Sequence, residues 1–353
     1  MTETGIDTEL ATAEECRPLY ERMARVKALA PWEFMEEGDL FAVIDPETGE
    51  PGFVSVMGMA GEHFAVAVYK GVEGLYAFSR VQELGPAVTP DDILDMPNVQ
   101  ASFEDREMVE KRDREHMKAL GLKFRGRNAW PLFRSYQPGF APWFIDRDEA
   151  RLLAYALEQL LDVGPRLLDA EEDLLMPGGD DDFLVRVPEQ TDGGLVWRDE
   201  TRPFAPPPAR DMMIHVELEM MAQVAALPVA PITAEVDCFR ILSVIAPPGE
   251  RPYFSYAVLA VEPKQGAPVG LEMLQPFPTL DDMWADTGSA VLGVLLNAGF
   301  RPRQLHVRNS LLHGILSMIG SKTGIKVKRV TSFEALDDVA EGLSIFMGGM
   351  GLF

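Results

Sequence analysis

Hydrophobic and polar positions divide the first half of the chain into helices and strands. Apolar residues at helical spacing, preceded by Thr12 with Glu15 three positions later, predict a first helix over residues 13–29. Three β-rich segments follow and predict a three-stranded antiparallel meander: residues 40–45, 52–58 and 63–70. Further helices are predicted over residues 71–84, 105–120 and 147–161. We therefore expect an N-terminal α+β domain over residues 1–165.

The pattern weakens between residues 166 and 228. Acidic residues surround Pro177-Gly178-Gly179, and residues 203–209 are rich in proline, which favours stiff, extended chain. We expect a connecting region with short strands at residues 182–187, 194–199 and 212–219. The sequence does not assign this region to either neighbouring domain.

The last part of the chain, residues 229–353, is predicted to form a second domain. It starts with three β-rich segments at residues 236–245, 253–262 and 269–276. Alternating helices and strands follow at residues 281–298, 304–309, 310–321, 325–330 and 332–346. Thr331 and Glu334 have the spacing of a helix cap at the start of the last helix. The predicted fold class is α+β with two domains.

The element order of this C-terminal domain resembles that of the ribonuclease-H-like fold. Active members of that fold hold two divalent metals with acidic residues, and the metals activate water against a phosphodiester. The matching positions here are Asp237, Asp286 and either Glu334 or Asp337. Asn309 stands where the resemblance implies a further acid, and Arg308 beside it disfavours a cation. A divergent metal-dependent hydrolase of nucleic acid or another phosphate ester is therefore an alternative, and no catalytic residue is assigned.

The N-terminal part is similar to an uncharacterised bacterial family, a domain of unknown function. The resemblance rests on residues 32–75, which begin WEFMEEGDLFAVID, and on residues 120–150, which begin LGLKFRGRNAWPLF. It covers about residues 15–165 and implies that a second uncharacterised domain follows. It also implies a bacterial source, but it supplies no activity and no functional residues.

Charge changes this picture in two places. The chain has 56 Asp and Glu against 32 Lys and Arg, a net charge of −24, which argues against a general nucleic-acid coat or a binder of anionic membranes. Two stretches contain no acid: residues 116–145, with five positive charges, and residues 287–333, with seven. We call them the first and second acid-free stretches. Each forms either a local basic groove or a surface that pairs with acids of the same chain.

Aromatic residues are concentrated in the first acid-free stretch. Residues 124–144 contain seven aromatic side chains interleaved with arginines, and such a combination stacks on ligand rings or bases. The predicted binding residues are Arg125, Arg127, Trp130, Arg134, Tyr136 and Trp143. The alternative is a proline-punctuated loop with buried rings and paired arginines, and burial of all seven rings would exclude the site.

No cofactor or metal is predicted, because neither a phosphate-binding loop nor a zinc pattern is present. The two cysteines, the acidic start and the lack of a 20-residue apolar run predict a cytoplasmic protein. We expect a non-catalytic binding or interaction module. Its partner is unidentified: a protein or a small molecule fits, a membrane does not, and a nucleic acid fits only at a local basic groove.

Overall fold

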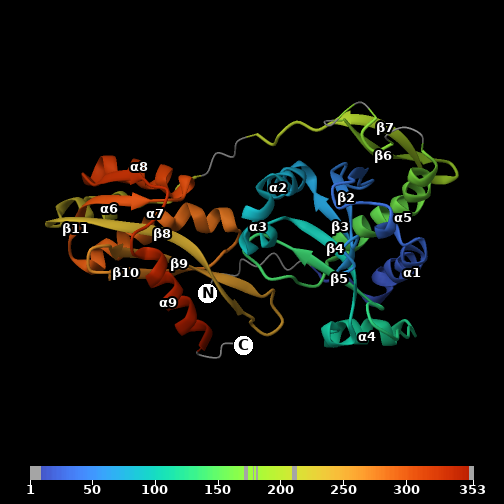
Figure 1. Ribbon diagram of the computed structural model, residues 1–353, viewed down its shortest axis with the longest axis horizontal. Coiled ribbons are helices and arrows are strands. Elements are labelled where there is room, and N and C mark those ends of the chain that lie inside the picture. The colour runs from blue at the N-terminus through green and yellow to red at the C-terminus, as the bar shows by residue number, and fades with distance from the viewer. Residues whose placement is uncertain (1–8, 171–173, 178, 180–181, 209–212, 350–353) are drawn as a thin grey trace. The chain divides into compact units, whose positions relative to one another are not determined.

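The computed structural model describes residues 9–170, 174–177, 179, 182–208 and 213–349 (Figure 1). Its contacts divide the chain into two compact units. The N-terminal unit contains the described residues up to 137 and those from 142 to 208, and the C-terminal unit contains residues 138–141 and those from 213 onward. Each unit combines helices with a β-sheet, so the protein is a mixed α+β protein, as predicted.

The described strands of the N-terminal unit form one seven-stranded sheet in the order β5-β4-β3-β2-β1-β6-β7. β1 and β6 are parallel, and all other neighbours are antiparallel. β6 and β7 lie in the predicted connecting region and hydrogen-bond into this sheet. The strands are β1 (Phe41–Ile44), β2 (Pro51–Met57), β3 (Phe64–Lys70), β4 (Asn98–Glu104), β5 (Trp130–Tyr136), β6 (Asp182–Thr191) and β7 (Gly194–Pro203).

The sequence therefore predicted too few strands for this unit. It missed β4 and β5, and the reasons can be identified. β4 has polar residues at alternate positions: Asn98, Gln100 and Ser102. Polar residues of this kind do not indicate a strand in the sequence. All three are nevertheless buried in the sheet. β5 contains Pro131, which argues against a central strand. The proline is tolerated because β5 lies at the edge of the sheet.

Helices cover both faces of this sheet. α1 (Ala13–Leu29) and α5 (Arg147–Asp169) pack on one face, where Leu19, Leu157 and Val54 are buried in a shared core. α2 (Gly71–Leu84) covers the other face, where Phe78 packs beside Tyr69 of β3. The remaining helical segments are α3 (Pro90–Leu94), α4 (Lys111–Ala119), and the short 3-10 turns η1 (Pro31–Glu33), η2 (Gly85–Ala87) and η3 (Arg106–Met108).

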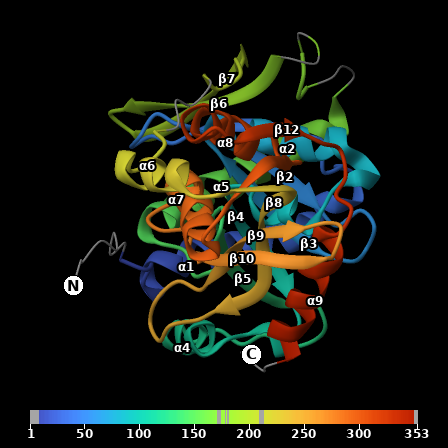
Figure 2. The same cartoon turned by 90° about the vertical axis from the view of Figure 1, so that its left-hand side faces the viewer.

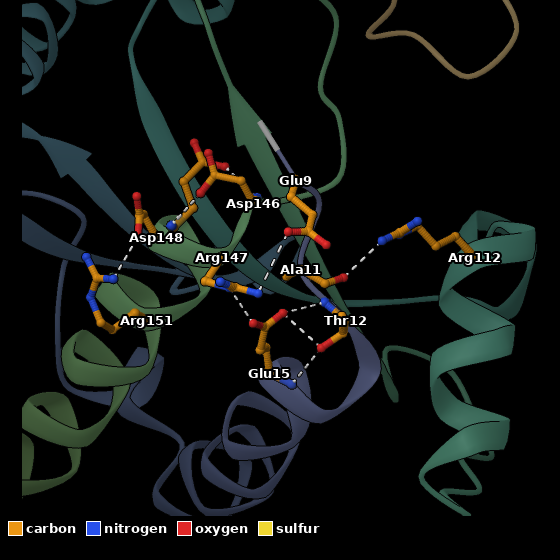
Figure 3. A network of polar contacts seen from close by, with 10 residues as sticks. Glu9, Ala11, Thr12, Glu15, Arg112, Asp146, Arg147, Asp148 and Arg151 are labelled. Atoms are coloured by element: carbon orange, nitrogen blue, oxygen red, sulfur yellow. Dashed lines mark hydrogen bonds and ion pairs between the residues drawn. The ribbon is translucent and has the colours of Figure 1, made fainter. Parts of the chain in front are cut away.

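The first turns of α1 and α5 are joined by a network of polar contacts (Figure 3). Thr12 and Glu15 form the predicted capping box of α1, and Asp146 and Glu149 form that of α5. Arg147 at the start of α5 donates to the Glu15 carboxylate over 2.5 Å. The carboxylate that caps α1 therefore also ties the two helices together.

The described strands of the C-terminal unit form a five-stranded sheet in the order β10-β9-β8-β11-β12. β8, β9 and β10 are successive antiparallel neighbours, whereas β8, β11 and β12 run parallel. The strands are β8 (Val229–Ile245), β9 (Tyr253–Glu262), β10 (Ala267–Leu274), β11 (Arg301–Val307) and β12 (Lys326–Arg329). The helices are α6 (Leu218–Ala226), α7 (Leu280–Ala298), α8 (Ser310–Thr323) and α9 (Leu336–Gly349), and they are labelled in Figures 1 and 2.

Two elements of this unit differ from their predictions. The strand predicted over residues 212–219 is absent from the described part: residues 213–217 form neither helix nor strand, α6 begins at Leu218, and residue 212 lies outside the described residues. The last helix begins at Leu336 and not at residue 332. Its first amides bind a residue from a distant strand, Glu235, so the cap predicted from Thr331 and Glu334 is wrong.

The C-terminal sheet has two distinct faces. α9 packs on the face that carries Leu259 and Val261 of β9, with Leu336 buried between them. α8 packs on the opposite face, where Gly320 allows close approach to Val327 of β12. Within the described residues, no helix is long and apolar enough to cross a membrane.

Candidate functional site

The loop between α4 and β5, residues 120–129, holds Lys123, Arg125 and Arg127, which are exposed cations of the first acid-free stretch. The Asn128 amide donates to the Asp105 carboxylate over 2.8 Å, and the Lys27 ammonium donates to the Asn128 carbonyl over 2.9 Å. These bonds fix the end of the loop before β5. Arg125 and Arg127 precede the anchored residue and are exposed. Neither forms an ion pair with a described residue.

A cavity of about 280 Å³ opens beside this loop. Its apolar lining comes from Met117 of α4, Leu122 of the loop and Trp130 of β5. Met117 is buried, whereas the Trp130 ring is half-buried and keeps one part of its surface open. The remaining lining residues are Arg114, Lys118, Gly121 and Lys123. We call this set of residues the Trp130 pocket.

Three positive charges surround the apolar lining of the Trp130 pocket. Arg114, Lys118 and Lys123 are exposed, and none forms an ion pair with a carboxylate of the described residues. Arg114 donates to the Val109 carbonyl over 2.7 Å, and this bond holds its guanidinium near the N-terminus of α4. An apolar surface beside unpaired cations suits a ligand that has both an anionic group and an apolar part.

A row of aromatic rings connects Trp130 to the core of the N-terminal unit. The Trp130 and Phe124 ring centroids are 6.0 Å apart, and those of Phe124 and Tyr20 are 6.1 Å apart. Tyr20 then meets Phe133 edge to face at 4.9 Å in the core. Of the seven predicted rings, Phe133 and Phe140 are buried and the other five are half-buried. The burial of all seven rings that would have excluded the site is therefore not observed.

Arg134 lies in the same stretch but is engaged inside the protein. Its guanidinium contacts Asp113 at 2.7 Å and Glu110 at 3.2 Å, and it lies 4.8 Å from the centre of the Phe144 ring. Burial disfavours the charged guanidinium, but the hydrogen bonds and negative charges of Asp113 and Glu110 together outweigh this effect and raise the pKa of Arg134. This arginine therefore binds α4 to β5, away from the lining of the Trp130 pocket.

Tyr136 and Trp143 also have partners within the chain. The Tyr136 hydroxyl donates to the Gln100 side chain over 2.9 Å, and burial raises the pKa of Tyr136. Trp143 pairs through its backbone with Ser135, with N–O distances of 2.8 and 3.0 Å. Neither residue lines the Trp130 pocket. Of the six predicted binding residues, the structure thus places Trp130 in the pocket and leaves Arg125 and Arg127 exposed on the adjoining loop.

The second acid-free stretch contains an arginine that joins two of the acids at the positions that match the ribonuclease-H-like fold. Arg308, directly after β11, contacts Asp237 of β8 at 3.0 Å and Asp337 of α9 at 3.1 Å. Its guanidinium also lies 4.6 Å from the centre of the Phe333 ring. Burial raises the pKa of Asp237 although Arg308 lies beside it. A cation of the protein itself therefore connects these two carboxylates.

The other two acids lie apart from this pair. Asp286 of α7 is 3.0 Å from the ring of His215, and Glu334 is held through its backbone amide, which donates to Glu235 over 2.6 Å. In the part of the chain that the structure describes, no three His, Cys, Asp or Glu residues are arranged to hold a metal ion. The predicted acids do not fit a two-metal site, and we derive no metal-dependent step from them.

The sequence did not identify most of the pocket lining. Arg114 and Lys118 are four positions apart on α4 and so share a helix face, which is a local signal. Met117, Leu122 and Trp130 come from a helix, a loop and an edge strand, and only the return of the chain at residues 120–129 brings them together. The spacing of these residues along the chain does not show that their side chains lie together in the fold.

Two family models match this chain. Residues 17–186 match the model of a domain of unknown function, DUF7309, and residues 220–344 match that of a second domain of unknown function, DUF6930. Two regions of the chain are thus similar to domains of unknown function, in the predicted order, and neither description names an activity. No curated protein matches the chain.

Proposed function

We propose that this protein is a non-catalytic binding module whose N-terminal unit captures a small anionic ligand with an apolar ring in the Trp130 pocket. One observation carries the proposal: a half-buried tryptophan lies beside three exposed cations that no described carboxylate neutralises. The ring supplies a flat apolar surface, and the cations supply the attraction for phosphate, sulfate or carboxylate.

The charge of the whole chain makes these cations distinctive. At a net charge of −24, most of the surface repels anions, and the first acid-free stretch is a local exception. A cavity of about 280 Å³ accommodates an aromatic ring with its anionic group. The rest of a larger ligand would extend out of the cavity. Arg125 and Arg127 on the adjoining loop are then available to the extended part.

For the C-terminal unit we infer a ribonuclease-H-like topology that serves as a scaffold. The sheet order β10-β9-β8-β11-β12, with two antiparallel hairpins followed by two parallel crossovers, supports this inference. Arg308 bridges Asp237 and Asp337, which supports the inference that these acids stabilise the fold and do not take part in hydrolysis.

Calorimetric titration with 1-naphthyl phosphate tests the pocket. We expect Trp130→Ala to weaken binding about tenfold, because aromatic stacking contributes about 1–3 kcal/mol. Lys118→Ala should weaken it about threefold, as an exposed ion pair is worth less than about 1 kcal/mol. Lys111→Ala is the matched control: it lies on the same helix outside the pocket, 3.8 Å from Glu115, and should change binding less than about twofold.

Two results would overturn the proposal. In the first, Trp130→Ala binds the probe as tightly as the unmodified protein. In the second, the neutral analogue 1-naphthalenemethanol binds as tightly as the phosphate, which would remove the role of the cations. Circular dichroism of each variant separates loss of the pocket from loss of the fold.

A further inference from the structure

The outer edge of β12 offers free backbone groups. β12 is the last strand in the sheet order and pairs only with β11. The Val330 amide donates to the Val307 carbonyl over 3.0 Å, and alternate residues of a parallel ladder face the same neighbour. Lys326 and Lys328 therefore turn their backbone groups toward β11, whereas Val327 and Arg329 direct theirs away from the sheet. No hydrogen bond within the described residues engages these outward groups.

The side chains of this edge are positively charged. The strand register places Lys326 beside Gln304 and Lys328 beside His306, so these four side chains share one face of the sheet. Both lysines are exposed, and neither forms an ion pair with a described residue. Arg329 is exposed on the opposite face.

The acids nearest in register do not neutralise the lysines. Glu235 of β8 lies beside His306, on the same face of the sheet. Its carboxylate accepts the amides of Glu334, Ala335 and Leu336 at 2.6, 3.0 and 2.9 Å, and it is 1% exposed. Asp237, two residues further along β8, pairs with Arg308. The positive charge of β12 thus remains available to an outside partner.

We propose that the β12 edge binds an acidic extended segment of a partner protein, which adds to the sheet as a sixth strand. Such a segment satisfies the outward amides and carbonyls of Val327 and Arg329. Acidic side chains two positions apart on a strand are separated by about 6.6 Å, the same spacing as Lys326 and Lys328. Charge therefore selects the partner, and backbone pairing fixes its register.

Two other occupants fit the edge less well. Single-stranded nucleic acid binds through aromatic stacking as well as charge, and β11 and β12 contain no Phe, Tyr or Trp. A second copy of this chain that paired through the same edge would bring like-charged lysines together, which discourages association.

The test uses a fluorescein-labelled ten-residue peptide in which Glu alternates with Val and Thr, followed by anisotropy. We expect Lys326→Glu with Lys328→Glu to weaken binding at least about tenfold. Arg329→Pro and Arg329→Ala form the decisive pair, because both remove the charge but only proline removes the outward amide. The proline variant should bind at least about fivefold more weakly than the alanine variant. Trp130→Ala should bind this peptide normally, which separates the proposal from that for the pocket.

Several results would overturn the proposal. Equal affinity of the Arg329→Pro and Arg329→Ala variants would exclude backbone pairing. Tighter binding of a ten-residue oligothymidylate that displaces the peptide would identify nucleic acid as the occupant. Concentration-dependent dimerisation that Arg329→Pro abolishes would identify a second copy. If Arg329→Pro does not fold, a peptide with a central proline gives the reciprocal test, and its undiminished binding would equally refute the proposal.

Discussion

The two acid-free stretches carry the same kind of charge but use it differently. Each commits one arginine to acids of its own unit: Arg134 pairs with Asp113, and Arg308 pairs with Asp237. Lys118 and Lys123 of the first stretch lie around an apolar hollow with Trp130, whereas Lys326, Lys328 and Arg329 of the second lie on the edge strand β12. A local charge reversal therefore does not define a partner by itself. The apolar surface or the backbone groups beside the charge decide which anion fits.

The largest expected effect concerns the arginine that is more deeply buried. The Arg134 side chain is 12% exposed and that of Asp113 is 8% exposed, so Arg134→Ala leaves a carboxylate without its partner in a dry site. We expect a loss of about 3 kcal/mol in the free energy of unfolding. Urea denaturation gives the total, and hydrogen exchange should show the loss at α4 and β5.

Arg308→Ala is the matched variant in the other stretch. The Arg308 side chain is 43% exposed, so water screens its ion pairs, and the raised pKa of Asp237 allows that carboxyl to take up a proton instead. We expect a loss of about 1 kcal/mol. Equal losses for Arg134→Ala and Arg308→Ala would contradict the distinction between a buried and a screened arginine.

The two units also differ in how a helix begins. α5 is capped locally by Asp146, whereas α9 depends on Glu235 from a distant strand. Glu235→Ala leaves three amides without an acceptor, and we expect a loss of about 2 kcal/mol. Hydrogen exchange should rise in the first turn of α9. Glu235→Gln keeps an oxygen acceptor and should lose less; an alanine variant with unchanged exchange in α9 would contradict the capping role.

This contrast also explains which parts of the structure the sequence could predict. α1 and α2 begin and end where predicted, at residues 13–29 and 71–84, because their patterns are local. The start of α9 was wrong because its cap is 99 positions away along the chain, in Glu235. β4 was missed because its buried polar residues find partners only in the folded sheet, as Gln100 does with Tyr136.

In the candidate sites, too, the sequence predicted local features but not contacts between distant residues. Trp130, Arg125 and Arg127 were proposed from composition, and the structure places Trp130 beside a cavity. The engagement of Arg134 with Asp113 was not predictable, because the sequence does not show that α4 lies against β5. In the C-terminal unit, Asp237 and Asp337 do come together, but through Arg308. Element order predicted their proximity, and Arg308 was recognised in the sequence as unfavourable to a metal, but its bridge between the two carboxylates was not predicted.

The smallest expected effect is a pH dependence of opposite sign in the two units. Burial raises the pKa of Asp237. Burial also acts to raise the pKa of Glu149, but Lys70 at 2.7 Å and the hydrogen bonds from Ser135 and the backbone together outweigh it, and the pKa of Glu149 is lowered. A raised carboxyl pKa stabilises the fold below the unfolded value of about 3.9, and this stabilisation is lost as pH rises through the folded pKa. A lowered pKa stabilises the fold above about 4.3, and this is lost as pH falls through the folded pKa.

Asp237→Asn and Glu149→Gln each remove one of these titrations. On acidification from pH 7 toward pH 4, the unmodified protein should gain stability relative to Asp237→Asn, because the buried carboxyl takes up a proton more readily in the fold. On further acidification, from about pH 4.3 toward about pH 3, it should lose stability relative to Glu149→Gln, because the Glu149 carboxyl takes up a proton in the unfolded chain before it does so beside Lys70 in the fold. Urea denaturation at about pH 7, 4 and 3 measures the two differences. Differences of the same sign would mean that the two buried carboxyls, one beside a half-exposed arginine and one beside a lysine, respond alike to their partners.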